Sequence, residues 1–265
     1  MRDAAIELLA KNIKNENPDG DSVRSKYGIN TLATGFLGTN VLTPVLSEMG
    51  RSDISYDLLL QDEQPSWLYE VKAGATTIWE RWNTYTMGKG FGTADMNSYN
   101  HYSYGAVAEW MYRYMAGIAV DVDNPGFKNI VFQPVLDIGE TYNSQTRIHS
   151  VDGTYESYYG EIRSAWTSSG EGGDTKLETY HVKVPANTTA TVYLPANETL
   201  IKSVKGSGSF WSVIGVSDAE STKHNGQKVI KVQLESGGYD FHMKNGGIQV
   251  THAEGYVVEG IDKNS

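Results

Sequence analysis

The chain has no cysteine among its 265 residues. This absence excludes disulfide bonds, thiolate catalysis and cysteine-ligated zinc. Long apolar runs are also missing, since no stretch approaches the roughly 20 residues that a membrane-spanning helix needs. The six histidines do not have the spacing of metal ligands. We therefore expect no disulfide, no membrane partner, and no metal or other cofactor.

Positive charge is scarce. The chain has 22 Lys and Arg residues against 32 Asp and Glu residues, for a net charge of −10. No block of Lys or Arg stands out, whereas phosphate binding depends on clustered positive charge. The sequence therefore predicts no nucleic-acid partner. A neutral carbohydrate would be indifferent to this charge balance.

The sequence pattern changes near Pro125. Apolar residues make up 39% of the chain and charged residues 20%, which is typical of a globular protein with a core. The length fits one large domain or two ordinary ones. Before Pro125 the apolar spacing is helical, and after it the spacing is that of strands. We predict a mainly helical part followed by an antiparallel β-sandwich.

The first part carries several amphipathic helix patterns. The clearest covers 103–118, where apolar residues recur at three and four positions. Ser66 is placed to cap a helix over 66–73 that Gly74 ends. The other predicted helices are an N-terminal one with Ile6, Leu9 and Ile13 that Asp19-Gly20 ends, one over 39–49 with Thr39 as cap, Gly50 as end and Pro44 as a potential kink, and one over 53–61.

The second part has short apolar or alternating runs at intervals that are typical of a β-sandwich. Asp152-Gly153 predicts a hairpin turn between strands at 147–150 and 155–166. The residues from Asn245 onward have no pattern that we can assign. The other predicted strands cover 129–134, 179–184, 190–194 and 228–234, with one more beginning at 237.

The run Gly74-Ala-Thr-Thr-Ile-Trp-Glu-Arg-Trp82 is the most informative stretch. It places Glu80 between Trp79 and Trp82, and two such indoles could form a flat wall on which a sugar ring stacks. Cleavage of a glycosidic bond needs carboxylates beside a sugar that gains positive charge. Glu80 is therefore a candidate general base that activates water. The alternative is a structural ion pair between Glu80 and Arg81 among core tryptophans.

Two further residues are candidates for sugar contact. His101, in the pair Asn100-His101, could bind a sugar hydroxyl or assist proton transfer. A histidine among tyrosines is as readily explained as a core or rim residue with its hydrogen bonds satisfied. Trp67 could be another sugar platform, and core packing explains it equally well.

These motifs together resemble the bacterial α-L-rhamnosidases of glycoside hydrolase family 78. The likeness covers residues 1 to about 243 and rests most strongly on the Gly74–Trp82 run. The other motifs that carry it are Thr34-Gly-Phe-Leu-Gly-Thr39, Pro65-Ser66-Trp67, Asn100-His101-Tyr102, 105–114, Pro125-Gly-Phe-Lys128 and the Gly-Glu-Ile-Arg-Ser-Ala-Trp strand within 155–166.

The resemblance implies a fold and a mechanism. The fold is an (α/α)6 barrel followed by a β-sandwich, so residues 1–124 would be the C-terminal half of the barrel and residues 125–265 the sandwich. The mechanism is inverting, with an acid and a base roughly 6.5–9.5 Å apart acting on terminal α-L-rhamnosyl residues. Glu80 matches the family's general base and His101 a histidine that lines the sugar subsite. Trp79 and Trp82 would be wall or support residues.

The chain departs from the family in its first part. The family's general acid lies in an earlier barrel segment, and residues 1–64 contain no counterpart. The helices would supply only about half of a barrel. We therefore expect a C-terminal portion that starts in mid-barrel, carries the base and lacks the acid. Such a portion would expose apolar helix faces, which favours homo-oligomers or pairing with a missing N-terminal half.

Two other functions stay open at this stage. The chain could be a non-catalytic carbohydrate-binding module, in which aromatic rings stack on sugars and Glu80 has no catalytic role. It could also be a structural or interaction protein with no affinity for sugars.

Overall fold

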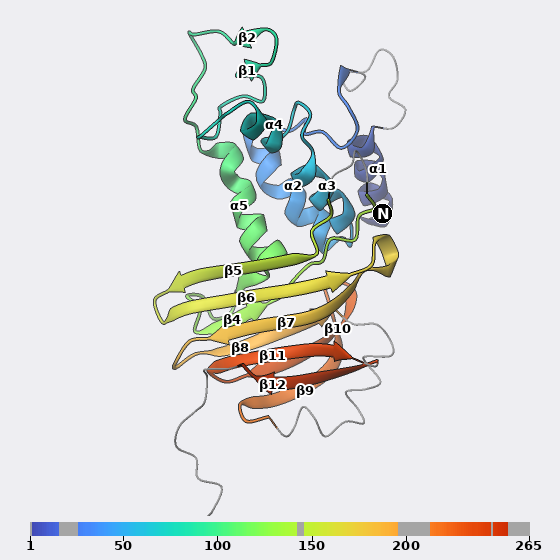
Figure 1. Ribbon diagram of the computed structural model, residues 1–265, viewed down its shortest axis with the longest axis vertical. Helices are drawn as coiled ribbons and strands as arrows, with labels where there is room; N and C mark the ends of the chain where they lie inside the picture. The colour runs from blue at the N-terminus through green and yellow to red at the C-terminus, as the bar shows by residue number, and fades with distance from the viewer. Residues whose placement is uncertain (1, 16–25, 142–145, 196–212, 245, 254–265) are drawn as a thin grey trace, which may run out of the picture. The chain divides into compact units, whose positions relative to one another are not determined.

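The computed structural model describes residues 2–15, 26–141, 146–195, 213–244 and 246–253 (Figure 1). The turn predicted at Asp19-Gly20 lies outside these residues. The chain divides into two compact units. Unit 1 comprises residues 1–110, 137–147 and 171–173, and unit 2 comprises residues 111–136, 148–170 and 174–265.

Unit 1 is helical, as the apolar spacing predicts. Its longer helices bury apolar side chains on one face, among them Ile6, Leu46 and Ile54. The helices predicted at 53–61 and 66–73 are confirmed. The helices are α1 (Arg2–Lys14), α2 (Phe36–Glu48), α3 (Ser52–Leu60) and α4 (Trp67–Lys72).

The two helix caps that we predicted have different outcomes. The Ser66 hydroxyl accepts a hydrogen bond from the Tyr69 N–H at the start of α4, as predicted. The prediction for Thr39 is wrong, because α2 begins at Phe36 with Gly35 as its N-cap. Thr39 lies inside the first turn, and its hydroxyl donates to the Gly35 carbonyl, 3.0 Å away. This local bond to a preceding carbonyl is a common choice for threonine within a helix.

The helix predicted over 103–118 is present but is not uniform. It starts as a 3₁₀ segment, η2 (Ser103–Ala106), continues as α5 (Val107–Trp110) and ends as a π-helical segment, η3 (Met111–Ala116). Gly117 stops it with a φ of 82°, and a Cβ there would lie 2.5 Å from the Pro134 nitrogen. The final predicted residue, Ile118, belongs to a strand instead.

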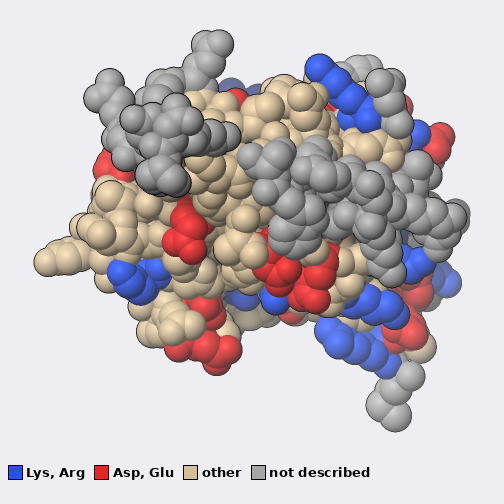
Figure 2. Space-filling model, turned by 90° about the horizontal axis from the view of Figure 1, so that it is seen from below, with Lys and Arg blue, Asp and Glu red and all other residues tan. Residues whose placement is uncertain are grey.

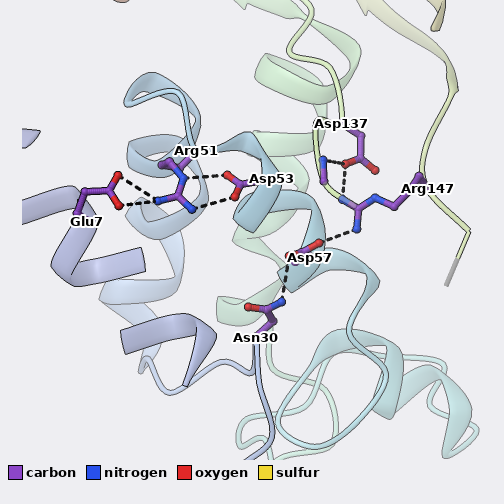
Figure 3. Close-up of polar contacts among 8 residues, drawn as sticks. Glu7, Asn30, Arg51, Asp53, Asp57, Asp137 and Arg147 are labelled. Carbon is purple, nitrogen blue, oxygen red and sulfur yellow. Dashed lines mark hydrogen bonds and ion pairs between the residues drawn. The ribbon is translucent and has the colours of Figure 1, made fainter. Parts of the chain in front are cut away.

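Arg147 holds unit 1 together from within (Figure 3). Its side chain is 1% exposed and donates to Asp57 Oδ1 at 2.6 Å and to Asp137 Oδ1. Asn30 donates to the other oxygen of Asp57, and the Gly139 N–H donates to Asp137. Burial raises the pKa of Asp57, and the Arg147 guanidinium lowers it in part. This buried network ties α3 to the segment 137–147.

A second network, centred on Arg51, lies nearer the surface (Figure 3). Arg51 donates to both oxygens of Asp53 at 3.1 and 2.9 Å, and to Glu7 of α1 at 3.2 Å. Glu7 is largely exposed. An exposed pair such as Arg51–Glu7 contributes little to stability, typically about 0–1 kcal/mol, and the Arg51 and Asp53 side chains are only partly buried, at 19% and 21% exposed. Arg147 is therefore the more important of the two arginines.

Unit 2 is formed by two five-stranded sheets, as the strand pattern predicts. Their strand orders are β3-β4-β8-β10-β9 and β12-β11-β7-β6-β5. Pairing is antiparallel except between β4 and β8. The strands are β3 (Ile118–Val120), β4 (Asn129–Phe132), β5 (Ser150–Ser157), β6 (Gly160–Ser169), β7 (Lys176–Val184), β8 (Thr189–Pro195), β9 (Val216–His224), β10 (Gln227–Leu234), β11 (Gly237–Lys244) and β12 (Gly247–His252).

The predicted hairpin around 147–166 exists, but its turn is not at Asp152-Gly153. Both residues lie inside β5 and pair with β6, and the chain turns between Ser157 and Gly160. A Cβ at Gly153 would lie 2.8 Å from the Cβ of Ala116. Glycine therefore serves close packing of the strand here, which a turn motif does not reveal.

The core of unit 2 contains the large aromatic side chains Phe132, Trp166, Tyr180 and Phe241. The strand β3 joins this unit ahead of Pro125, so the compact units divide at Trp110 and Met111, whereas the sequence pattern placed the change at 124–125. On the face that Figure 2 shows, basic and acidic side chains are interspersed, without one broad basic area.

Candidate active site

Backbone pairing in unit 1 brings the two main candidate residues onto adjacent segments. The Glu80 N–H donates to the Ser98 carbonyl at 2.9 Å, and the His101 N–H donates to the Ile78 carbonyl at 2.8 Å. The Thr77 hydroxyl also donates to the Tyr99 carbonyl. Residues 77–80 therefore lie beside residues 98–101. A small hairpin, β1 (Tyr85–Thr86) and β2 (Gly90–Phe91), lies between these segments in the sequence.

The Glu80 carboxylate is half-buried and is held by one of its oxygens. Oε2 accepts the Ser98 N–H at 2.8 Å. Within the described part of the chain, Oε1 accepts no hydrogen bond. The alternative ion pair with Arg81 is not found among the described residues, and Arg81 is exposed. The carboxylate is thus oriented by a backbone donor and keeps one oxygen available to a water molecule.

The three tryptophans support this segment from inside unit 1. Trp79 is 5% exposed and packs edge-on against Tyr85. Trp67 is also buried, and its indole N–H donates to the Tyr104 carbonyl at 2.9 Å. Trp82 is half-buried and stacks on Tyr104 with ring centroids 3.8 Å apart. Trp79 and Trp82 therefore belong to separate ring clusters and do not form the one flat wall that their spacing suggested.

His101 stacks on two aromatic rings. Its imidazole stacks on Phe36 of α2 at 4.7 Å and on Tyr102 at 5.9 Å. The Ser103 N–H approaches Nδ1 at 3.5 Å, which is a long hydrogen bond. Within the described residues Nε2 has no hydrogen-bond partner. The ring is thus fixed by stacking and keeps one nitrogen for a ligand.

An open cleft of about 650 Å³ lies on unit 1 beside these segments. His101 lines it, as does Ile78, while Glu80 follows two positions along the chain and is not among the lining residues. Asn40 and Glu109 are lining residues that sequence reasoning missed. In the sequence, the sign that could have pointed to them is that each is a polar residue at the edge of an apolar helix face. The full lining is Asn40, Thr77, Ile78, Asn100, His101, Tyr102, Ser103, Gly105, Ala106 and Glu109.

Glu70 is a second carboxyl group near Glu80 that sequence reasoning missed. It lies on α4 and is 2% exposed. Its Oε2 accepts the Trp79 N–H at 3.3 Å, and its Oε1 has no hydrogen-bond partner among the described residues. Burial raises the pKa of Glu70 to about 7, against a smaller lowering effect of the Trp79 hydrogen bond.

The described residues include no group of three or more His, Asp or Glu side chains placed to hold a metal ion. In the same residues no helix has both the length and the apolar character needed to span a membrane.

Two family models match the chain in succession. The bacterial alpha-L-rhamnosidase six-hairpin glycosidase domain matches residues 15–115, and the bacterial alpha-L-rhamnosidase C-terminal domain matches residues 117–209. The chain belongs to the bacterial α-L-rhamnosidase family. It matches the C-terminal portion of that family, as the sequence motifs predicted.

Individual α-L-rhamnosidases support the assignment. One from Formosa agariphila is 37% identical over 91% of this chain, and one from Alteromonas sp. is 34% identical over 82%. The crystal structure of a Streptomyces avermitilis α-L-rhamnosidase complexed with L-rhamnose is 31% identical over 90% of this chain, with a TM-score of 0.64. The chain spans only 24%, 21% and 19% of these three proteins, respectively.

Proposed function

We propose that this chain supplies the base-bearing portion of an inverting α-L-rhamnosidase. In this proposal Glu80 is the general base that activates water, and His101 contacts the rhamnosyl residue. The observation that carries the proposal is the Glu80 carboxylate, which is oriented by the Ser98 N–H through Oε2 and has no partner for Oε1 within the described residues. An inverting base needs a fixed carboxylate with one oxygen free to accept a proton from water.

The cleft supports the choice of a sugar as ligand. His101 and Tyr102 line the cleft with aromatic surface, and the side chains of Asn40, Asn100 and Glu109 line it with polar groups. Such a mixture suits a deoxyhexose, which has both apolar carbon faces and hydroxyl groups. The related Streptomyces avermitilis protein was crystallised with L-rhamnose. Trp67, Trp79 and Trp82 then act as support for the cleft and not as stacking platforms.

The general acid is the part that this proposal assigns to residues outside the chain. An inverting enzyme needs two carboxyl groups about 6.5–9.5 Å apart, one of which protonates the leaving oxygen. Each such group typically contributes about 10²–10⁴-fold to the rate. The chain by itself would therefore cleave unactivated rhamnosides poorly.

The test uses a joined protein that links this chain to the preceding barrel portion of an α-L-rhamnosidase. In that protein Glu80→Gln should lower kcat by about 10²–10⁴-fold and leave the Kd for L-rhamnose nearly unchanged. Glu63→Gln, which changes an exposed carboxylate of unit 1, serves as the control and should retain the rate. Retention of most of the rate by Glu80→Gln would contradict Glu80 as the base and, with L-rhamnose still bound, would leave this chain a role in sugar binding alone.

A further inference from the structure

Glu70 is a buried carboxyl group that the proposed mechanism does not use. It lies on α4, ten positions before Glu80, and its Oε2 reaches the backbone N–H of Trp79. Trp79 directly precedes Glu80, so the hydrogen bond acts on the residue next to the proposed base. On the other side, the Glu80 N–H and Oε2 both bond to Ser98. The Trp79–Glu80 segment is therefore held between α4 and residue 98.

The location of Glu70 is costly for the fold. An ionised carboxylate that is 2% exposed and has one oxygen without a partner among the described residues loses much of its hydration. Among the described residues, no lysine or arginine lowers the pKa of Glu70 by stabilising its ionised form. A glutamine or an apolar residue would fill the same space without that cost. Costly buried polar groups are concentrated at functional sites.

We propose that Glu70 is a positioning residue for Glu80, and that its carboxyl group fixes the Trp79–Glu80 peptide by accepting the Trp79 N–H. This inference rests on the proposed role of Glu80. The charged form of a carboxyl group accepts a stronger hydrogen bond than the neutral form. The hydrogen bond from the Trp79 N–H to Glu70 should therefore become stronger as Glu70 loses its proton.

The surroundings of Glu70 allow this titration near neutrality. Burial raises the pKa of Glu70 to about 7. Among the described residues, Tyr104 of η2 is an ionisable side chain on which the Glu70 charge acts, and its own pKa is raised by burial first and by the Glu70 charge second. Tyr104 therefore stays neutral in this range and does not oppose the titration. Protonation of Glu70 favours the folded state, so its contribution to stability is lost as pH rises through about 7.

The experiment follows two backbone amides of the 265-residue chain by ¹H–¹⁵N NMR across the neutral pH range. The Trp79 amide reports its bond to Glu70, and the Ser98 amide reports the Glu80 carboxylate that it binds. Both signals should titrate together with a midpoint near pH 7, and the Trp79 amide proton should move downfield as pH rises. Glu70→Gln keeps an acceptor for Trp79 but cannot ionise, so both transitions should vanish.

Two controls make the outcome decisive. A histidine side chain ordinarily titrates in the same pH range, so His101→Asn should leave both transitions in place, as should Glu63→Gln. The inference is overturned if the transitions persist in Glu70→Gln, or if the Trp79 amide titrates while the Ser98 amide does not. The readout needs neither sugar nor turnover. A failure of Glu80 as the base would therefore appear in the kinetics of the joined protein and leave this result unaffected.

Discussion

Removal of the Arg147 side chain should strongly destabilise unit 1. In Arg147→Met the carboxylates of Asp57 and Asp137 lose the cation that binds both of them, in a place where the three side chains are 1%, 11% and 0% exposed, respectively. Breaking a buried ion pair by removing one partner typically costs about 3–5 kcal/mol, because the remaining charge is left uncompensated. Such a loss is a large part of the roughly 5–15 kcal/mol that stabilises most domains.

The loss of stability in Arg147→Met should also depend on pH, and the direction of that dependence follows from the pKa of Asp57. Burial raises the pKa of Asp57 and Arg147 lowers it, so removal of the guanidinium should raise that pKa further. A carboxyl group whose pKa is higher in the folded state favours folding when protonated, and this contribution is lost as pH rises through the folded-state pKa. Arg147→Met should therefore be less destabilising at about pH 5 than at about pH 8.

The assay is urea unfolding followed by tryptophan fluorescence, which reports mainly on unit 1 because Trp67, Trp79, Trp82 and Trp110 all lie there. The control is Lys72→Met, also in unit 1, which breaks an exposed pair with Asp62 and should cost about 1 kcal/mol or less. A loss in Arg147→Met no larger than in this control, or a loss that grows as pH falls, would contradict the role of Arg147 as the buried cation of unit 1.

Three further predictions concern the chain as it stands. The purified chain should show little or no turnover of natural rhamnosides, and robust release of rhamnose would contradict the proposal that the general acid lies outside the chain. The chain should self-associate in light scattering, because Phe36, Leu37 and Val41 of α2 are 38%, 90% and 54% exposed, and a monomer at moderate concentration would argue against this. Ser66→Ala should cost about 0.5–2 kcal/mol in urea unfolding through loss of the N-cap, whereas Ser66→Asp should retain most of the stability.

The helices and most strands could be predicted from the sequence because their apolar spacing agrees with the surfaces they bury. The strand β9 was missed because it is mostly polar, with most of its side chains at least partly exposed. The short β12 was missed because a glycine-rich stretch precedes it. The turn at Asp152-Gly153 was wrong because Gly153 serves a close contact with Ala116, which is distant in sequence. Local motifs cannot reveal such contacts.

The candidate site could be predicted only in part. The importance of Glu80 and His101 followed from their motifs, and that prediction still awaits a test. Their proximity depends on hydrogen bonds between residues 77–80 and residues 98–101, which no local pattern shows. The burial of Trp79 and the position of Glu70 behind it are likewise tertiary facts. Charge and polarity alone make Glu70 look like an ordinary surface residue of a short helix.

The most direct test of the central claim is chemical rescue of Glu80→Ala in the joined protein. Azide is a nucleophile that needs no deprotonation, so it can replace the water that a missing base no longer activates. If Glu80 is the base, azide should restore turnover of an aryl α-L-rhamnoside, and NMR should identify the product as the β-configured rhamnosyl azide. No rescue, or an azide product with retained α configuration, would contradict the role of Glu80 as the base of an inverting reaction.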